Sequence, residues 1–509
     1  MDGSLLKKDD KRKNDLLKLD DPKEGFNKDK IKREMLIYSF AFGILFDYFF
    51  IWDSFGINLT LFNFAMLAVL IVIIYPCVNF KNKLSYIFLI PYLLLSLSYS
   101  IYTNEVFRFL NLLLLPFLLI SYIMCIKSDE ISINLSFIKN VYNKIFGTII
   151  KSLPIFLKSN KFKIKEEDIK KNSNYKYIIR GILLLMPMLF IIMFLLCSSD
   201  MLFEKFFYKL LQDFYDVRIK KIVGHVFVVF MVAIYLFALF FRIKHEKYTE
   251  YFESSTDKKE TIKWNYITVA TIIIGINLVY LSFSIVQFSY LYGGGNGELP
   301  LGVSYAEYAR KGFFELILIT LINFLIVLCC KFFTEGQTKK TERFCNVLYT
   351  IMIGFTYNIL FSAYYRMNLY ESKFGYTRLR VLVEAFIFLL TIILIVVLFR
   401  IWKKSFPIVK YITIITFSVY VVLNYANIDR IIVQKNVERY KVEGKLDISY
   451  INKLSYDSYF EMAKLLDMND KTIKTEVMGY FETHRIDLVG DYDKWYEFNY
   501  YKNKFKNYK

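Results

Sequence analysis

Long apolar runs, separated by lysine-rich connectors, constrain the fold of this 509-residue chain more than any other feature. Two of the clearest runs are Leu183–Cys197 and Val381–Phe399. A helix crosses a bilayer core of about 30 Å with about 20 apolar residues. Although 22% of the residues are charged, the 55% that are hydrophobic are gathered in blocks, which is atypical of a water-soluble domain. The sequence therefore predicts an all-α integral membrane helical bundle.

The apolar pattern predicts about eleven transmembrane helices. They are expected at Leu36–Trp52, Ile57–Val78, Leu84–Tyr102, Phe107–Ile126, Ile178–Cys197, Ile222–Phe241, Tyr266–Phe288, Gly312–Phe333, Phe344–Tyr364, Leu379–Trp402 and Ile408–Tyr425. A charged tail, 1–35, precedes this polytopic domain, 36–426, and a small helical extramembrane domain with a break at Gly444 follows it at 427–509. Within the polytopic domain, the basic connector 127–177 has apolar residues at helical spacing and is expected to lie along the inner membrane surface.

The formal net charge of +19 indicates membrane topology rather than nucleic-acid binding, because the basic residues lie in the connectors and no nucleic-acid-reading motif accompanies them. Alternate connectors hold most of the lysines, which predicts a cytoplasmic N-terminus, an exoplasmic C-terminus and contact with anionic lipid headgroups. The connector that contains Lys205 and Lys221 departs from this alternation. Its aromatic and acidic residues suggest an interfacial helix instead.

Metal, disulfide and cofactor chemistry have little support in the sequence. The six cysteines show no Cys-x-x-Cys spacing, and the three histidines, His225, His245 and His484, are far apart. The glycine-rich run Gly293–Gly297 lacks the Lys-Ser or Lys-Thr of a phosphate loop, so we interpret 288–312 as a flexible loop that can act as a lid. We expect no cofactor and no metal.

Charged residues gather near the predicted outer ends of several helices. The candidate polar network consists of Asp47, Glu307, Arg310, Glu315, Arg366, Glu371, Arg378, Arg380 and Glu384. The i,i+4 spacing predicts the ion pairs Arg380–Glu384 and Lys311–Glu315, and we interpret 364–384 as an exoplasmic turn. Charge near a bilayer core usually has a partner or a function. The network is therefore either an outward-facing polar cavity or a structural network that locks helices together.

Four separated strings resemble a known family. They are FGILFDYFFIWDSFGINLTLF, SYAEYARKGFFELILITLINFLIVL, YYRMNLYESKFGYTRLRVLVEAF and NIDRIIVQKNVERYKVEGKLDISYINKLSYDSY. In this order they resemble the bacterial polytopic membrane proteins of domain-of-unknown-function family 4173, which has family 4153 as a broader relative. The resemblance implies a multispanning protein of the bacterial cytoplasmic membrane, and it brings no activity, cofactor or catalytic residue with it.

Three classes of function remain open. A transporter or ligand-binding protein that uses the polar layer is the leading hypothesis, and a non-enzymatic role is favoured. A cell-envelope signalling or scaffold protein, with a protein partner for the C-terminal domain, is the first alternative. The second is an envelope enzyme that acts on a lipid-linked substrate with Asp47, Asp53 and Glu384 as acid/base groups.

Overall fold

A computed structural model of the chain describes its helices and their connections. The described residues are 22–51, 54–75, 78–127, 132–159, 196, 217–245, 264–290, 312–334, 338–468, 470–491 and 494–507. They form two compact units, each assembled from separate stretches of sequence. Unit 1 comprises Met1–Ser54, Leu61–Asn79 and Val141–Lys247, and unit 2 comprises Phe55–Thr60, Phe80–Asn140 and Tyr248–Lys509.

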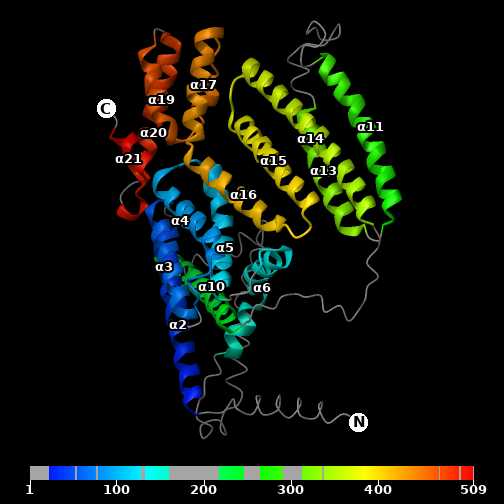
Figure 1. The fold of residues 1–509 in the computed structure, drawn as a ribbon. Coiled ribbons are helices and arrows are strands. Elements are labelled where there is room, and N and C mark those ends of the chain that lie inside the picture. The colour runs from blue at the N-terminus through cyan, green and yellow to red at the C-terminus, as the bar shows by residue number, and fades with distance from the viewer. Residues whose placement is uncertain are drawn as a thin grey trace, which may run out of the picture. The chain divides into compact units, whose positions relative to one another are not determined.

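Long apolar helices dominate the described residues, which makes the chain a multi-pass membrane protein. Nine helices in this part of the chain are long and apolar enough to cross a bilayer. They are α3 (Ile57–Ile74), α4 (Tyr86–Ile101) continued by the 3-10 turn Lys83–Ser85 before it, α5 (Glu105–Lys127), α10 (Val217–His245), α11 (Tyr266–Tyr290), α13 (Phe313–Phe333), α14 (Lys339–Phe374), α15 (Arg378–Trp402) and α16 (Ile408–Tyr425) (Figure 1). Each corresponds to one of the predicted helices.

Two of the eleven predicted spans are not among these nine. The span predicted at Ile178–Cys197 lies outside the described residues, apart from Leu196. The span predicted at Leu36–Trp52 falls in α2 (Pro22–Phe50), a helix of 29 residues. Even its last 18 residues contain three charged residues, Arg33, Glu34 and Asp47, so α2 is not among the helices apolar enough to cross a bilayer. The total of eleven stays a prediction.

The turn predicted at 364–384 is much shorter in the structure. Helix α14 continues to Phe374, and α15 begins at Arg378. The intervening Gly375 has a φ of 82°, which favours glycine because it carries no Cβ. Arg366 and Glu371 therefore lie on a helix rather than in a loop, because the helix extends well past the apolar stretch from which its end was predicted.

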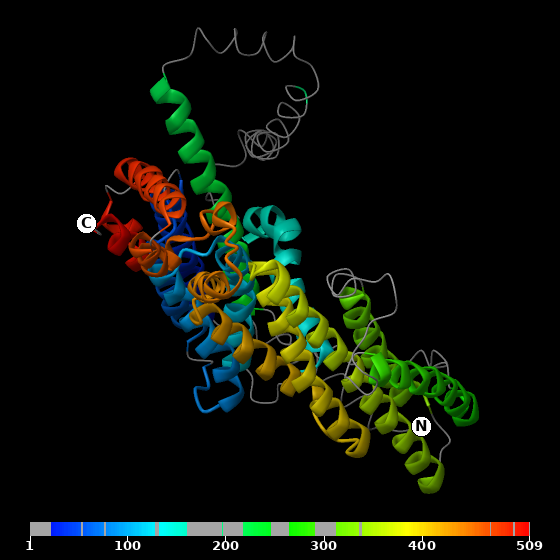
Figure 2. The same ribbon diagram turned by 90° about the horizontal axis from the view of Figure 1, so that it is seen from above.

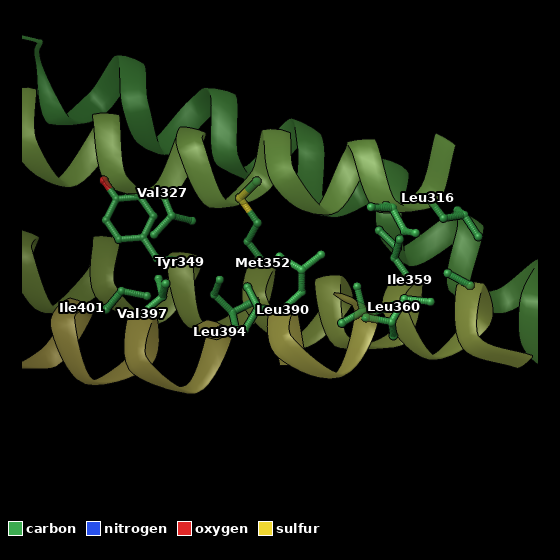
Figure 3. Close-up of a cluster of buried hydrophobic side chains, with 14 of the residues drawn as sticks. Leu316, Val327, Tyr349, Met352, Ile359, Leu360, Leu390, Leu394, Val397 and Ile401 are labelled. Carbon is green, nitrogen blue, oxygen red and sulfur yellow. The ribbon is translucent and has the colours of Figure 1, made fainter. Parts of the chain in front are cut away.

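An apolar core joins α13, α14 and α15. Its buried side chains interleave along the three helices (Figure 3). They include Leu316 and Val327 from α13, Tyr349, Met352, Ile359 and Leu360 from α14, and Leu390, Leu394, Val397 and Ile401 from α15. The opposite faces expose large apolar side chains such as Leu318 and Phe388, as expected of helices that are solvated by lipid.

Shorter helices follow the last span. They are α17 (Ile428–Glu443), α18 (Ile448–Ile451), α19 (Tyr459–Ala463), α20 (Lys471–Asp491) and α21 (Tyr500–Lys506), drawn in orange and red in Figures 1 and 2. Gly444, at the predicted break, ends α17 with a φ of 68°. A second apolar cluster buries Ile432, Met462 and Val477 of these helices against Phe107 of α5. Whether they form a separate extramembrane domain stays a prediction.

In unit 1, α2 and α10 pack closely. Gly43 of α2 lies so near α10 that a Cβ there would approach the Val229 carbonyl oxygen to 2.7 Å. Small residues allow such close contacts between membrane helices. The predicted amphipathic connector contains α6 (Leu135–Ser159), and Arg242 of α10 donates to the Thr148 hydroxyl of α6 at 2.7 Å. The position of α6 along the inner membrane surface stays a prediction.

Candidate functional site

A buried carboxylate, Asp429, organises the polar end of unit 2. It lies in the first turn of α17, where the Asn427 side chain accepts a hydrogen bond from the Arg430 amide. Arg378, the first residue of α15, donates to both carboxylate oxygens, through Nε at 2.7 Å and Nη2 at 2.5 Å. This bidentate geometry is the strongest that an arginine forms with a carboxylate. It fixes the start of α15 to the start of α17.

Asn104 connects the same carboxylate to a second one. Its Nδ2 donates to Asp429 at 3.1 Å, and its backbone amide donates to Asp457 at 3.1 Å. Thr103 donates to Asp457 from both its amide and its hydroxyl at 2.7 Å. The Asn104 side-chain oxygen accepts from the Val106 amide and so caps α5. Two carboxylates thus lie at the N-terminus of α5, where the helix dipole favours negative charge.

Asp457 is only 2% exposed. Burial raises the pKa of Asp457 to about 6, because a carboxylate loses its hydration when it leaves water. The hydrogen bonds from Thr103 act in the opposite direction, since they favour the charged form, and nearby Asp429 adds to the rise. The pKa of Asp457 thus lies between that of an exposed aspartate and that of a carboxyl buried without partners.

A small polar pocket opens beside this cluster. Its enclosed volume is about 10 Å³, which is room for a group of about the size of a water molecule, and the rest of the hollow is open to solvent. It is lined by Ser98, Tyr102, Asn104, Phe107, Arg108, Asn111, Asn424, Asn427, Ile428 and Asp457. These residues come from the C-terminal ends of α4 and α16, the N-terminal end of α5, the start of α17 and the segment before α19. The pocket therefore lies where these helix ends meet.

Buried side-chain amides form one wall of the pocket. Asn111 Nδ2 donates to Asn424 Oδ1 at 2.7 Å, and Asn111 Oδ1 accepts from the Tyr420 hydroxyl at 2.7 Å. Ser98 accepts from Asn111 at a longer distance of 3.3 Å. Polar residues at such depth in a bundle are costly unless they are paired, so this chain of bonds joins α4, α5 and α16 firmly.

The carbonyl groups at the end of α4 bind side chains from elsewhere in unit 2. Arg108 donates to the Tyr99 carbonyl at 3.2 Å and to the Tyr102 carbonyl at 3.0 Å. Asn499, near the C-terminus, donates to the Tyr99 carbonyl at 2.9 Å. Carbonyls at a helix end have no partner within the helix, so these donors cap α4 and rigidify the rim of the pocket.

Helix α17 also binds the turn between α14 and α15. Asn436 accepts from the Tyr376 amide and donates to the Tyr376 carbonyl, both at 2.9 Å. Arg439 donates to the Ser372 and Lys373 carbonyls at 2.9 Å, which satisfies the end of α14. A Cβ at Gly375 would lie 2.6 Å from Asn436 Oδ1, so this contact excludes a larger residue.

Two members of the predicted network, Glu371 and Glu384, meet across α14 and α15. Their carboxyl groups lie within hydrogen-bond reach of each other. Arg380, predicted to pair with Glu384, instead donates to the Gly375 carbonyl and stacks on the Tyr370 ring at 4.3 Å from its centroid. The i,i+4 prediction fails here because the backbone carbonyl at the turn is the nearer acceptor.

Other members of the predicted network lie apart from this pair. Arg366 is 9% exposed. A Cβ added at Gly312 would lie only 2.7 Å from Arg366 Nη1, so the guanidinium group lies close against Gly312. Glu315 is exposed on α13. Glu307, Arg310 and Lys311, the predicted partner of Glu315, lie outside the described residues, as does most of the lid predicted at 288–312.

Asp47 belongs to unit 1, where it binds His225 of α10. The distance between His225 Nδ1 and the Asp47 carboxylate is 2.8 Å. Sequence reasoning did not pair these residues, because 178 positions separate them. Asp53, named with Asp47 as a candidate acid/base group, lies outside the described residues.

The central residues of the polar end are not among those predicted from the sequence. These are Asn104, Asn111, Asn424, Asp429 and Asp457. The sequence carries helix-start signals at two of these places. Thr103 and Asn104 precede Glu105 at the start of α5, and Asn427 precedes Asp429 at the start of α17. Such signals reveal a cap but not its tertiary partner. In the part of the chain that the structure describes, no group of three or more His, Cys, Asp or Glu side chains is arranged to hold a metal ion.

Comparison with known protein families identifies a match over most of the chain. Residues 89–465, most of the chain, match the family model described as a domain of unknown function, DUF4153. The chain belongs to the DUF4153 family. The relation to family 4153 expected from the four strings is thereby confirmed. Searches of curated proteins and of solved structures found no match to this DUF4153 protein.

Proposed function

We propose that this DUF4153 protein binds a small polar ligand at the polar end of unit 2, as a transporter or as a ligand-binding membrane protein. The observation that carries the proposal is the pocket that Asn104, Asn111, Asn424 and Asp457 line beside Arg108. Binding sites commonly combine a concave shape with a few fixed polar groups. Here both hydrogen-bond donors and acceptors border the space.

The chemistry of the lining suggests a class of ligand. Amides and the Ser98 hydroxyl both donate and accept hydrogen bonds, and Asp457 and Arg108 bring charges of opposite sign to the same rim. This combination suits a small zwitterion or a polyol better than a lipid tail. The enclosed space admits one polar group of about the size of a water molecule, so the rest of a bound ligand lies in the part of the hollow that is open to solvent.

A signalling or scaffold role is the second candidate, because α17 makes so many contacts with the ends of the spans. Asn436, Arg439 and Asp429 all bind residues at the turn between α14 and α15. A partner that moved α17 would act directly on that turn. We propose in addition that this end faces the outside of a bacterial cytoplasmic membrane and that the N-terminal tail lies inside, as the lysine distribution predicts.

A thermal-shift assay on the purified full chain tests ligand binding. Amino acids, monosaccharides and inorganic phosphate are the probes. At least one is expected to raise the melting temperature of the parent chain. Asn111→Leu is expected to weaken that binding by about fivefold or more, since each lost hydrogen bond costs about 1 kcal/mol or more.

Two serines of α4 provide a matched control. Both hydroxyls donate to a carbonyl of their own helix, but only Ser98 lines the pocket, whereas Ser100 does not. Ser98→Ala should weaken binding, and Ser100→Ala should leave it unchanged. If no probe shifts the parent chain, or if a ligand shifts all the variants equally, the pocket is not the binding site.

A further inference from the structure

The pair formed by Glu371 and Glu384 has a different chemistry from the pocket. Glu371 is 1% exposed, and its carboxyl group lies within hydrogen-bond reach of that of Glu384. Two carboxylates cannot share a hydrogen bond when both are ionised, because neither then carries a proton to donate. Like charges at this distance also repel strongly, so such pairs hold one proton between them.

The helix positions indicate which carboxyl group carries the proton. Glu371 lies in the last turn of α14, which ends at Phe374, so it faces the negative end of a helix dipole. Glu384 lies in the second turn of α15, nearer to a positive end, and it is partly exposed. Burial and the dipole both disfavour charge on Glu371. The proton therefore belongs to Glu371, and the negative charge belongs to Glu384.

A second observation concerns one carboxyl oxygen of the buried group. Glu371 Oε1 has no hydrogen-bond partner among the residues that the structure describes. A buried carboxylate oxygen without a partner would be costly if charged and costs less in a protonated carboxyl group. The burial of this oxygen thus also favours a neutral Glu371.

The surrounding charges are consistent with one bound proton. Arg380 of α15 is the cation that acts on Glu371, and Tyr376 lies in the turn beside the pair. From α17, Lys435 and Glu438 face Tyr376. Lys435 and Glu438 bind each other at 3.0 Å and so offset each other. Two carboxylates beside one guanidinium carry a net charge of −1, which one proton neutralises.

We propose that Glu371 and Glu384 form a proton-binding site at the turn between α14 and α15, in which Glu371 holds the proton and hydrogen-bonds to the Glu384 carboxylate. The site is separate from the polar pocket, and it stands whether or not the pocket binds a ligand. Because Asn436 and Arg439 of α17 bind the same turn, release of the proton would place a second negative charge where three helices meet.

Infrared difference spectroscopy on the purified full chain during a pH titration tests this site. At slightly alkaline pH, where exposed carboxyl groups are ionised, the parent chain should retain the band of one protonated carboxyl group. Glu371→Gln should abolish that band. In Glu384→Gln, the protonated-carboxyl band should disappear at a lower pH than in the parent chain, because the neighbouring negative charge that retains the proton is gone.

Glu315→Gln is the matched control, since Glu315 is an exposed glutamate on a neighbouring helix, and it should leave the band unchanged. The absence of the band from the parent chain overturns the proposal even if no variant folds. Persistence of the band in Glu371→Gln overturns it as well. Sodium-dependent stabilisation without a protonated carboxyl band would assign the pair to a metal cation instead, and that result also contradicts the proposal.

Discussion

The apolar core of α13, α14 and α15 and the polar cluster around Asp429 hold helices together in different ways. In the core, side chains such as Met352 and Leu394 are fully buried among other hydrocarbon groups (Figure 3). In the polar cluster, Arg378, Asn104 and Asp457 form specific bonds at defined angles and distances. The first arrangement tolerates small displacements along the helices, whereas the second fixes which helix ends meet.

The bilayer explains the difference. Lipid tails are as apolar as leucine, so burial in the core gains packing but little from the hydrophobic effect. Charges are expensive at the midplane and less so near helix ends, which is where Arg378 and Asp429 lie. Helix pairing through ionic bonds is therefore available only at the ends. The two regions consequently predict different sensitivities to mutation.

The largest effect is expected from breaking the ion pair at the polar end. Arg378→Ala leaves the fully buried Asp429 carboxylate without its counter-charge and should lower the free energy of unfolding by about 3–5 kcal/mol. Unfolding of the purified chain in mild detergent, followed by circular dichroism, measures this. Arg378→Met combined with Asp429→Asn should recover most of the loss.

The exposed pair Lys435–Glu438 provides the control for that experiment. Glu438→Gln should leave the unfolding midpoint unchanged, because solvent screens exposed ion pairs. Equal losses from Glu438→Gln and Arg378→Ala would contradict the distinction between buried and exposed charge at this end of the molecule.

A smaller, pH-dependent effect is expected from Asp457. Because its pKa is about 6 in the folded chain and about 4 for an unfolded aspartate, the folded state binds more protons between these values. Stability should fall by about 2–3 kcal/mol as the pH rises from about 4 to about 6, and it should then level off.

The difference between the parent chain and Asp457→Asn isolates this contribution. Asn has no titrating group, so the variant should lack this fall, although it also loses an acceptor for the Thr103 and Asn104 amides. Lowered pKa values at Glu461 and Asp470 act in the opposite direction, but they are common to both chains. Parallel stability curves for the two chains would show that Asp457 does not titrate in this range.

The smallest effect is expected in the apolar core. Leu394→Ala should cost about 1–2 kcal/mol, mainly through the cavity that it leaves, because lipid solvates the separated helices. Leu318→Ala, on a lipid-exposed face, should cost much less. A loss at Leu394 as large as that at Arg378 would show that packing, rather than the polar cluster, dominates stability.

The predicted and observed networks differ in the partners of their charged residues. Arg378 was identified as a charge that needed a partner, but that partner, Asp429, lies 51 residues further along the chain. Thr103 and Asp457 are separated by 354 residues. Helical spacing suggested partners four residues away, and at Arg380 a backbone carbonyl was nearer. Local periodicity has no information about such long-range pairs.

The sequence by itself determined that the chain is a multi-pass helical membrane protein and where nine of its long apolar helices lie. That is possible because the cost of placing a residue in lipid is a property of the residue and its near neighbours. Only the tertiary structure decided that Glu371 meets Glu384, that Asp429 holds Arg378 and that Asn111 and Asn424 line a pocket. These outcomes depend on which helix ends pack together, and that packing is the sum of many contacts between residues far apart in the chain.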